Sequence, residues 1–250
     1  MSQSNELSRR YYVTPGLCNA RKELPLPHLV SDIIELATEH ANILGFGFKQ
    51  MTPKGIGWVL SRLSVKMLRY PKFGEHFTLS TWIEDWNRHF SIRDFMLQTD
   101  EGEILGYARS IWMVIDLVNH TNAGTSSLNF STELISKKEI PIPPLKKVHN
   151  PVVNTSNEYT FRYTDIDFYG HVNTVRYIEL LLNQFPLSRY ETSFVSRFEI
   201  AFKHEGKYGE TAQLDISELA EGTYHILLKR DEQQLVESQL VFEENTQEEL

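Results

Sequence analysis

The sequence predicts an α+β fold of two similar halves, each an antiparallel sheet wrapped around one long helix. A tetrapeptide in the first half, Lys72-Phe73-Gly74-Glu75, recurs with a single change as Lys207-Tyr208-Gly209-Glu210, 135 residues further along the chain. Each copy follows a helical pattern and a strand-like run, and further alternating runs come after it. Such self-similarity indicates duplication. One mostly apolar helix for four or five antiparallel strands favours a sheet that wraps around the helix.

In the first half, a helix is expected over residues 28–44, and it ends at Gly45, a residue suited to the C-terminal end of a helix. One side of this helix is mostly apolar and comprises Leu29, Ile33, Leu36, Ala37, His40, Ile43 and Leu44. Alternation of apolar and polar residues, as over 77–82, marks half-buried strands. The segment 100–103 is typical of a hairpin turn. The expected strands are 58–68, 76–84, 90–99 and 104–117.

The second half repeats this order. A helix is expected over residues 172–183 and stops before Pro186, which cannot continue it. The segment 230–232 is typical of a hairpin turn between the last two strands. The expected strands are 193–202, 213–219, 224–230 and 233–243.

These elements predict two domains joined by a linker. Prolines at 141, 143 and 144 and small polar residues mark the linker, which has room for a short helix over 128–136. The acidic tail 243–250 is expected to fray. The predicted boundaries are 1–118 for the N-terminal domain, 119–157 for the linker and 158–250 for the C-terminal domain.

Composition limits the class of protein. Hydrophobic residues make up 41% of the 250 residues and charged residues 23%, which is typical of a soluble globular protein. No apolar run is long enough to cross a membrane, and the first residues lack the apolar core of a signal peptide. The single cysteine, Cys18, fits a reducing compartment, so we expect a cytoplasmic protein. The net charge of −8 argues against nucleic-acid binding, and contact with an acidic partner would need a local basic patch.

Four polar residues fall within nine positions of the second half: Asp165, Asp167, His171 and Asn173. The helical pattern begins directly after them, so the cluster is expected at a helix N-terminus. That end of a helix exposes unpaired N–H groups and carries partial positive charge. Carboxylate, imidazole and amide donors gathered there can attack a carbonyl group and hold the oxyanion that develops.

Motifs in both halves carry a family resemblance. The segment 165–173 reads Asp-Ile-Asp-Phe-Tyr-Gly-His-Val-Asn, which is similar to a DxDxNxHVN signature. The matching segments of the first half are Trp58-Val59-Leu60-Ser61-Arg62, Arg69-Tyr70-Pro71, Thr81-Trp82, Arg93-Asp94-Phe95 and Ala108-Arg109-Ser110-Ile111-Trp112. Together these motifs resemble the acyl-acyl carrier protein (ACP) thioesterases of plants and bacteria, with the bacterial members more similar.

The resemblance implies two hot-dog folds in tandem and hydrolysis of the thioester of fatty acyl-ACP, which releases free fatty acid and ends fatty acid synthesis. It implies no metal and no organic cofactor, and a carrier protein that presents the acyl chain on a phosphopantetheine arm. Alternatives are an acyl-CoA thioesterase and a non-catalytic acyl-binding module; a hot-dog dehydratase is less favoured. The protein could be a monomer or a homodimer, because a tandem duplication can satisfy internally the pairing that single hot-dog domains achieve by dimerising.

The resemblance also implies the catalytic residues. The family aspartate corresponds to Asp167, its histidine to His171 and its glutamate to Glu205. Two positions depart from the family pattern. Tyr169 stands where the family usually has asparagine, and Gly206 stands where some members have a cysteine, so a cysteine nucleophile is impossible there.

A mechanism follows as a hypothesis. The substrate carbonyl oxygen would point at the helix N-terminus, near the amides of Gly170 and His171. Glu205 would activate water or attack the carbonyl itself, and His171 would supply a hydrogen bond or proton. Asp167 would orient these partners. Tyr169 could replace the missing asparagine as a hydrogen-bond donor.

Each of these residues has a simpler alternative. Asp167 could cap the second helix, His171 could be structural, and Glu205 could be an exposed charge at a strand end. Tyr169 could serve packing only, and Asn173 is expected to hold local backbone. His204 with Glu205 could help to bind a metal, but no metal-binding motif such as HExxH occurs in the chain, so no metal site is predicted.

The first half lacks the acid–histidine cluster, so we expect it to line the acyl pocket. Pocket candidates, each of which could instead be plain core, are Leu29, Ile33, Trp58, Leu60, Trp82 and Trp112. An acidic carrier protein calls for a basic docking patch. Candidates for that patch, which could also be scattered solvated charges, are Arg62, Lys66, Arg69, Arg88, Arg93, Arg162 and Arg176.

Overall fold

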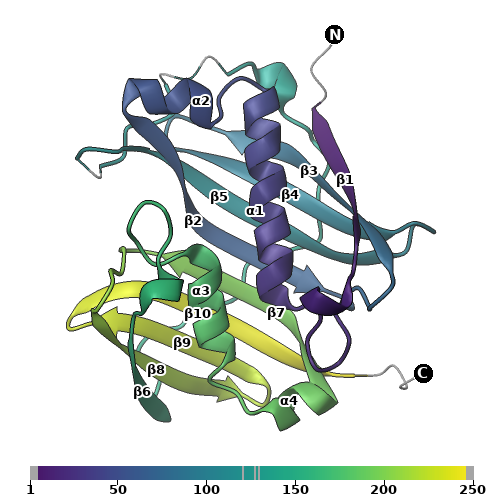
Figure 1. Ribbon diagram of the computed structural model, residues 1–250, viewed down its shortest axis with the longest axis vertical. Helices are drawn as coiled ribbons and strands as arrows, with labels where there is room; N and C mark the ends of the chain where they lie inside the picture. The colour runs from purple at the N-terminus through teal and green to yellow at the C-terminus, as the bar shows by residue number, and fades with distance from the viewer. Residues whose placement is uncertain (1–4, 120, 127, 129, 246–250) are drawn as a thin grey trace. The chain divides into compact units, whose positions relative to one another are not determined.

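The computed structural model describes residues 5–119, 121–126, 128 and 130–245. The chain divides into two compact units, residues 1–142 and 143–250. Each unit contains a five-stranded antiparallel sheet with a helix lying across one face (Figure 1). The division between the units falls inside the segment 119–157 that the sequence marks as a linker.

Unit 1 places its strands in the order β1-β3-β4-β5-β2, with every neighbouring pair antiparallel. The long helix α1 covers this sheet (Figure 1). The elements are β1 Glu6–Tyr12, η1 Pro15–Leu17, α1 Leu26–Ile43, α2 Phe48–Met51, η2 Thr52–Lys54, β2 Ile56–Met67, β3 His76–Trp86, β4 Phe90–Thr99, β5 Ile104–Asp116 and η3 Thr132–Leu134.

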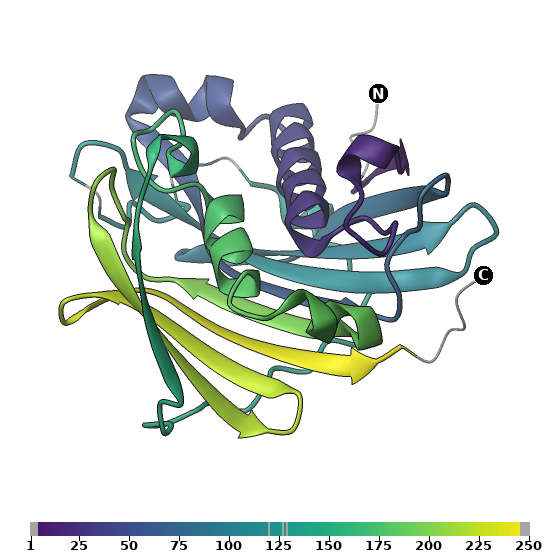
Figure 2. The same cartoon turned by 60° about the horizontal axis from the view of Figure 1, so that its bottom comes forward.

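Unit 2 has the same topology, with strand order β6-β8-β9-β10-β7. Its shorter helix α3 lies on the sheet, as Figure 2 shows. The elements are β6 Thr155–Thr160, η4 Tyr163–Asp165, α3 Thr174–Leu182, α4 Leu187–Thr192, β7 Ser193–Phe202, β8 Thr211–Ala220, β9 Thr223–Arg230 and β10 Gln233–Glu244. The predicted tandem hot-dog architecture is therefore confirmed.

Both predicted long helices and all eight predicted strands are present, each within two residues of its predicted ends. The sequence did not reveal β1 and β6, because these edge strands are mostly polar and exposed and show no clear alternation. Of the segment 128–136, where a short helix was expected, residues 128 and 130–136 are described, and the helical residues among them are the three of η3. Part of the tail expected to fray, residues 246–250, lies outside the described residues.

The repeated tetrapeptide forms the same turn in both units. The Lys72 amide donates to Glu75 Oε2 at 2.8 Å, and the Lys207 amide donates to Glu210 Oε2 at 2.9 Å. The glycine inside each turn has a φ near +80°, a conformation that side chains disfavour: 81° at Gly74 and 79° in the second copy. The same turn therefore occurs in both units, in agreement with the duplication inferred from the sequence.

Each turn also binds the residue that follows the edge strand. The Val13 amide donates to the Glu75 carbonyl at 3.0 Å, and the Phe161 amide donates to the Glu210 carbonyl at 3.0 Å. These matched bonds align the two units residue by residue. They allow positions in unit 1 to be compared with those of the candidate site in unit 2.

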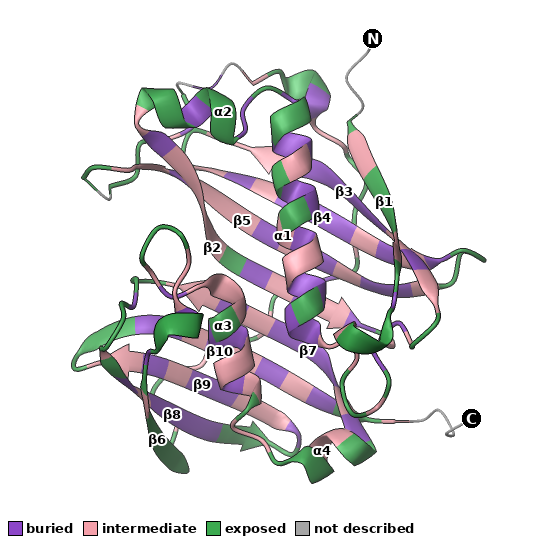
Figure 3. Ribbon diagram, viewed as in Figure 1, coloured by how far each residue is buried: buried purple, intermediate pink, exposed green. Residues whose placement is uncertain are grey.

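The helices bury apolar faces against the sheets, and Figure 3 shows the buried stripe along α1. Leu29, Val30 and Ile33 on α1 have no exposed surface, and neither have Ile178 and Leu181 on α3. Burial of side chains of this size contributes about 1.5–3 kcal/mol each. The helices therefore have fixed positions on their own sheets, which in unit 2 fixes the N-terminus of α3.

One carboxyl group on α1 should make stability depend on pH. Burial raises the pKa of Asp32 to about 7, and the nearby Glu35 adds to the effect. Because the ordinary value is 3.8, the folded protein binds more protons than the unfolded chain between about pH 4 and pH 7, so stability falls as pH rises through that window.

Asp32→Asn should remove this dependence. We expect the wild type to lose about 2 kcal/mol more unfolding free energy than the variant between pH 5 and pH 8, a value discounted for the partial exposure of the group. Urea unfolding at the two pH values measures the difference. Equal losses in both proteins would contradict the assignment.

Candidate active site

The polar cluster found in the sequence lies in the turn before α3 in unit 2. Asp165 ends η4 and is buried. Its Oδ2 accepts hydrogen bonds from the Tyr159 hydroxyl at 2.9 Å and the Arg162 amide at 2.7 Å. Asp165 therefore holds the backbone that leads into the turn of residues 167–171.

Asp167 closes the turn that presents His171. Its Oδ1 accepts from the amides of Tyr169 at 2.8 Å and His171 at 3.3 Å, while its own amide donates to the His171 carbonyl at 2.8 Å. The Gly170 amide donates to the Asp167 carbonyl at 3.0 Å, and Gly170 has a φ of 84°. The two amides expected to hold an oxyanion, those of Gly170 and His171, are thus both engaged within the turn.

Asn173 caps α3. Its side-chain oxygen accepts from the Val175 amide at 2.8 Å, and its own amide donates to the Asp165 carbonyl at 2.8 Å. The expectation that Asn173 holds local backbone is confirmed. The alternative in which Asp167 caps the helix is wrong, because the turn of residues 167–171 intervenes.

The structure brings His171 and Glu205 together. The distance from His171 Nε2 to Glu205 Oε2 is 3.1 Å, although the two residues come from different loops of unit 2. The imidazole is 19% exposed and the carboxylate 43%, so the pair is anchored on the histidine side and open to solvent on the glutamate side. An imidazole joined to an accessible carboxylate can accept and donate protons.

The loop that carries Glu205 is bonded to α3 and to its preceding turn. The Val172 amide donates to the Gly206 carbonyl at 2.9 Å, and the Gly206 amide donates to the Tyr177 hydroxyl at 2.9 Å. Tyr177 is buried, and burial raises its pKa to about 12, so it stays neutral near pH 7. The sequence carries no signal that marks Tyr177 as a site residue, because a tyrosine on the inner face of a helix usually indicates core.

Tyr169, which replaces the family asparagine, is half exposed, and its ring lies 4.1 Å from that of Phe168 between centroids. Burial, aided by Asp167, raises the pKa of its hydroxyl. The observed contact fits the packing alternative for this residue.

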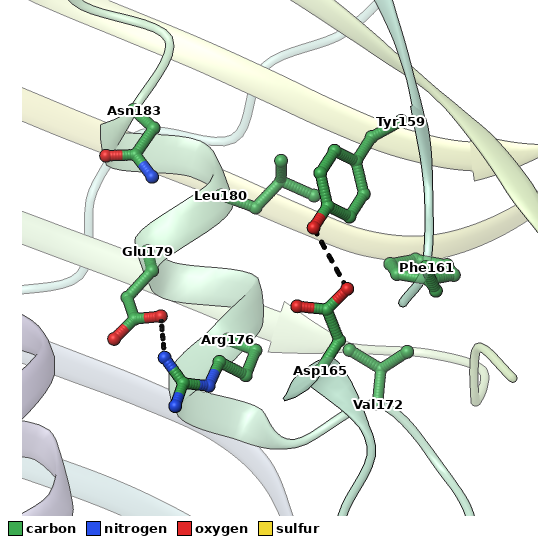
Figure 4. Close-up of a pocket in the computed structure, with 8 residues that line it drawn as sticks. All are labelled: Tyr159, Phe161, Asp165, Val172, Arg176, Glu179, Leu180 and Asn183. Atoms are coloured by element: carbon green, nitrogen blue, oxygen red, sulfur yellow. Dashed lines mark hydrogen bonds and ion pairs between the residues drawn. The ribbon is translucent and has the colours of Figure 1, made fainter. Parts of the chain in front are cut away.

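A small pocket of about 70 Å³ opens beside the turn, between β6, η4 and α3 (Figure 4). The lining residues are Tyr159, Phe161, Asp165, Val172, Arg176, Glu179, Leu180 and Asn183. Arg176 and Glu179 form an ion pair at its edge. The histidine–glutamate pair does not line this pocket.

Unit 1 lacks an equivalent pair. The Leu24 amide donates to the Pro71 carbonyl at 2.9 Å, which matches the bond between Val172 and Gly206. By this alignment Tyr70 occupies the position of Glu205, and the residue before Leu24 is a glutamate in place of His171. At these matched positions the histidine–glutamate contact therefore belongs to unit 2.

The six acyl-pocket candidates all lie in unit 1. Leu29, Ile33 and Trp82 are fully buried. Leu60 and Trp112 are half-buried and face each other on β2 and β5. Trp58 is half-buried and packs against the core cluster near the end of α1. Their role in acyl binding remains a prediction.

The residues predicted to form the carrier-docking patch differ in how far they are buried and in whether they are paired. The choice of Arg93 is wrong, because it is 4% exposed and its Nη1 lies 2.7 Å from His40 Nδ1 in the interior of unit 1. Arg69 is held by Glu75 and Glu103, and Arg176 by Glu179. The remaining candidates are Arg62, Arg88 and Arg162, which are exposed, and Lys66, which is half-buried.

Among the described residues, no group of three or more histidine, cysteine, aspartate or glutamate side chains is placed to hold a metal ion. Within the same part of the chain, no helix is long and apolar enough to cross a membrane.

Two hot-dog units, with the contact between His171 and Glu205 in the second, define a double hot-dog protein. The chain belongs to the acyl-ACP thioesterase family: the family's N-terminal domain matches residues 4–123, and its C-terminal domain matches residues 148–247.

Relatives agree with this assignment. A crystal structure of an acyl-ACP thioesterase from Bacteroides thetaiotaomicron is 30% identical, with a TM-score of 0.86 over 96% of this chain and 98% of that one. A putative oleoyl thioesterase from Lactobacillus plantarum, 20% identical over 97% and 96% of the two chains with a TM-score of 0.82, shares the fold. A chloroplastic palmitoyl-ACP thioesterase from Gossypium hirsutum is 27% identical over 191 residues, which is 71% of this chain and 46% of that protein. The chain spans about half the length of the curated relatives it matches.

Proposed function

We propose that the protein hydrolyses the thioester of fatty acyl-ACP and releases free fatty acid. The 3.1 Å contact between His171 and Glu205 carries this proposal, because it supplies a proton acceptor and a proton donor at one accessible point of unit 2. Family membership names the thioester class, and the relatives' names include acyl-ACP hydrolases. The same pair could act on acyl-CoA, which is the second candidate.

In the proposed reaction, Glu205 accepts a proton from a water molecule whose oxygen attacks the thioester carbonyl carbon. The tetrahedral intermediate then collapses as the carbon–sulfur bond breaks. The departing sulfur leaves as a thiolate or takes a proton from the His171–Glu205 pair. Asp167 contributes through the turn, because its carboxylate binds the backbone that holds His171.

We propose that the carrier docks on the surface around this pair. Tyr163 is 84% exposed, Phe168 82% and Tyr208 69%, which is unusual for aromatic side chains. Arg162 and Lys207 are exposed on the same two loops, which the bond between Phe161 and Glu210 joins. Aromatic rings with basic residues beside them suit an acidic protein that delivers an apolar chain.

A cytoplasmic location remains part of the proposal. It rests on the composition and on Cys18, which is a free thiol. The plant relatives are described as chloroplastic, and that statement applies to them alone.

Free-thiol release from acyl-ACP and acyl-CoA tests the function and the docking surface together. We expect faster release from the carrier, and Arg162→Glu with Lys207→Glu should raise KM for acyl-ACP about tenfold while changing KM for acyl-CoA less than about twofold. Lys54→Glu, an exposed charge of unit 1, is the matched control. Release from acyl-CoA alone would favour the second candidate. Acyl binding without release from either donor would indicate a binding module.

A further inference from the structure

Position 206, next to Glu205, has no room for a side chain, and the residue there is glycine. A Cβ atom there would lie 2.8 Å from a ring carbon of Phe161, 2.8 Å from the Tyr177 hydroxyl and 3.1 Å from Val172 Cγ2. Its φ lies outside the left-handed region, so backbone conformation does not require glycine here. The residue is buried although Glu205 is exposed.

The Tyr177 hydroxyl fills the place that a side chain at position 206 would take. It accepts the Gly206 amide hydrogen at 2.9 Å, and its residue is 4% exposed. The rings of Phe161 and Phe202 lie 5.8 and 6.1 Å from the tyrosine ring, so the hydroxyl has a fixed position. A fixed oxygen is therefore bonded to the backbone directly beside the reactive carboxylate.

Gly206 is held on its other side as well. Its carbonyl accepts the amide of Val172, the residue after His171. The residue after the glutamate is thus bonded to the residue after the histidine, and the Tyr177 hydroxyl accepts from the amide of that same Gly206. These bonds join the backbone next to His171 to the backbone next to Glu205.

We propose that Tyr177 is a positioning residue, whose hydroxyl holds the Glu205–Gly206 backbone so that the Glu205 carboxylate meets His171. The inference rests on the proposed function of the same site. Tyr177 does not touch the substrate. It acts through the Gly206 amide, and the absence of a side chain at position 206 makes this possible.

Tyr177→Phe tests the proposal, because it removes the oxygen and keeps the ring. We expect kcat for acyl-ACP to fall about 10- to 100-fold with KM changed less than about twofold, since loss of orientation impairs the chemical step. Tyr190→Phe is the matched control: Tyr190 is a half-buried tyrosine of unit 2 whose hydroxyl donates to the Leu182 carbonyl at 2.7 Å. The control should keep kcat within about twofold.

A second readout does not depend on turnover. The ring ¹⁵N signals of His171 in the free protein report the contact at Nε2, and in Tyr177→Phe they should move toward those of Glu205→Gln. Unchanged ring signals, a kcat within twofold of wild type, or a variant that fails to fold would each overturn the proposal. An inactive wild-type protein whose ring signals respond as expected would instead reject the thioesterase function and keep the positioning role.

Discussion

Glu205→Gln should lower kcat for acyl-ACP by about 100-fold or more, because glutamine cannot accept the proton of the attacking water. The substitution keeps the size of the side chain and an oxygen that can face His171 Nε2. Since the carboxylate is 43% exposed, little stability should be lost. Free-thiol release under saturating substrate measures kcat, and circular dichroism checks the fold.

Glu232→Gln, an exposed glutamate in the hairpin between β9 and β10, is the control and should retain wild-type turnover. Near wild-type release by Glu205→Gln would remove the glutamate from the mechanism and leave His171 as the only proton acceptor of the pair.

The second large effect concerns the interior of unit 1. Asp94 has no exposed surface, and its two oxygens accept from Arg109 Nε at 2.7 Å and Nη2 at 2.8 Å. Arg109→Met should cost about 3–5 kcal/mol of unfolding free energy, because it leaves a buried carboxylate without its partner.

The loss should depend on pH. Burial raises the pKa of Asp94 and the Arg109 guanidinium opposes that rise, so the pKa climbs further when Arg109 is removed. A carboxyl whose folded pKa lies above its unfolded value destabilises the fold increasingly as pH rises. Urea unfolding should therefore show a larger cost at pH 8 than at pH 5, and Asp94→Asn should recover much of it in the Arg109→Met background. A cost equal at both pH values, or no recovery, would contradict this account.

The repeated elements could be read from the sequence because apolar spacing reflects burial on one face of a helix or strand. The edge strands could not, since β6 reads Thr-Ser-Asn-Glu-Tyr-Thr and is mostly exposed. The identity of β1 and β6 depends on pairing with distant strands, which local periodicity does not report.

The candidate site was only partly readable. His171 stands out beside two aspartates at a helix start, whereas Glu205 lies in a polar loop and was found through the family resemblance alone. Arg93 was misplaced because arginine is usually exposed, and here a strand turns it toward α1. The role of Tyr177 depends on a contact with a residue 29 positions away, which no sequence pattern shows.

The matched turns of the two units have an evolutionary consequence. Where unit 2 has the Gly206 amide, unit 1 has Pro71, which has no N–H and so cannot be held by a tyrosine hydroxyl. Tyr70→Glu would therefore supply a carboxylate without the backbone hydrogen bond that holds the residue after Glu205 in unit 2. The histidine would still be missing. A second histidine–glutamate contact in unit 1 would therefore need changes at three positions, 23, 70 and 71, and not at one.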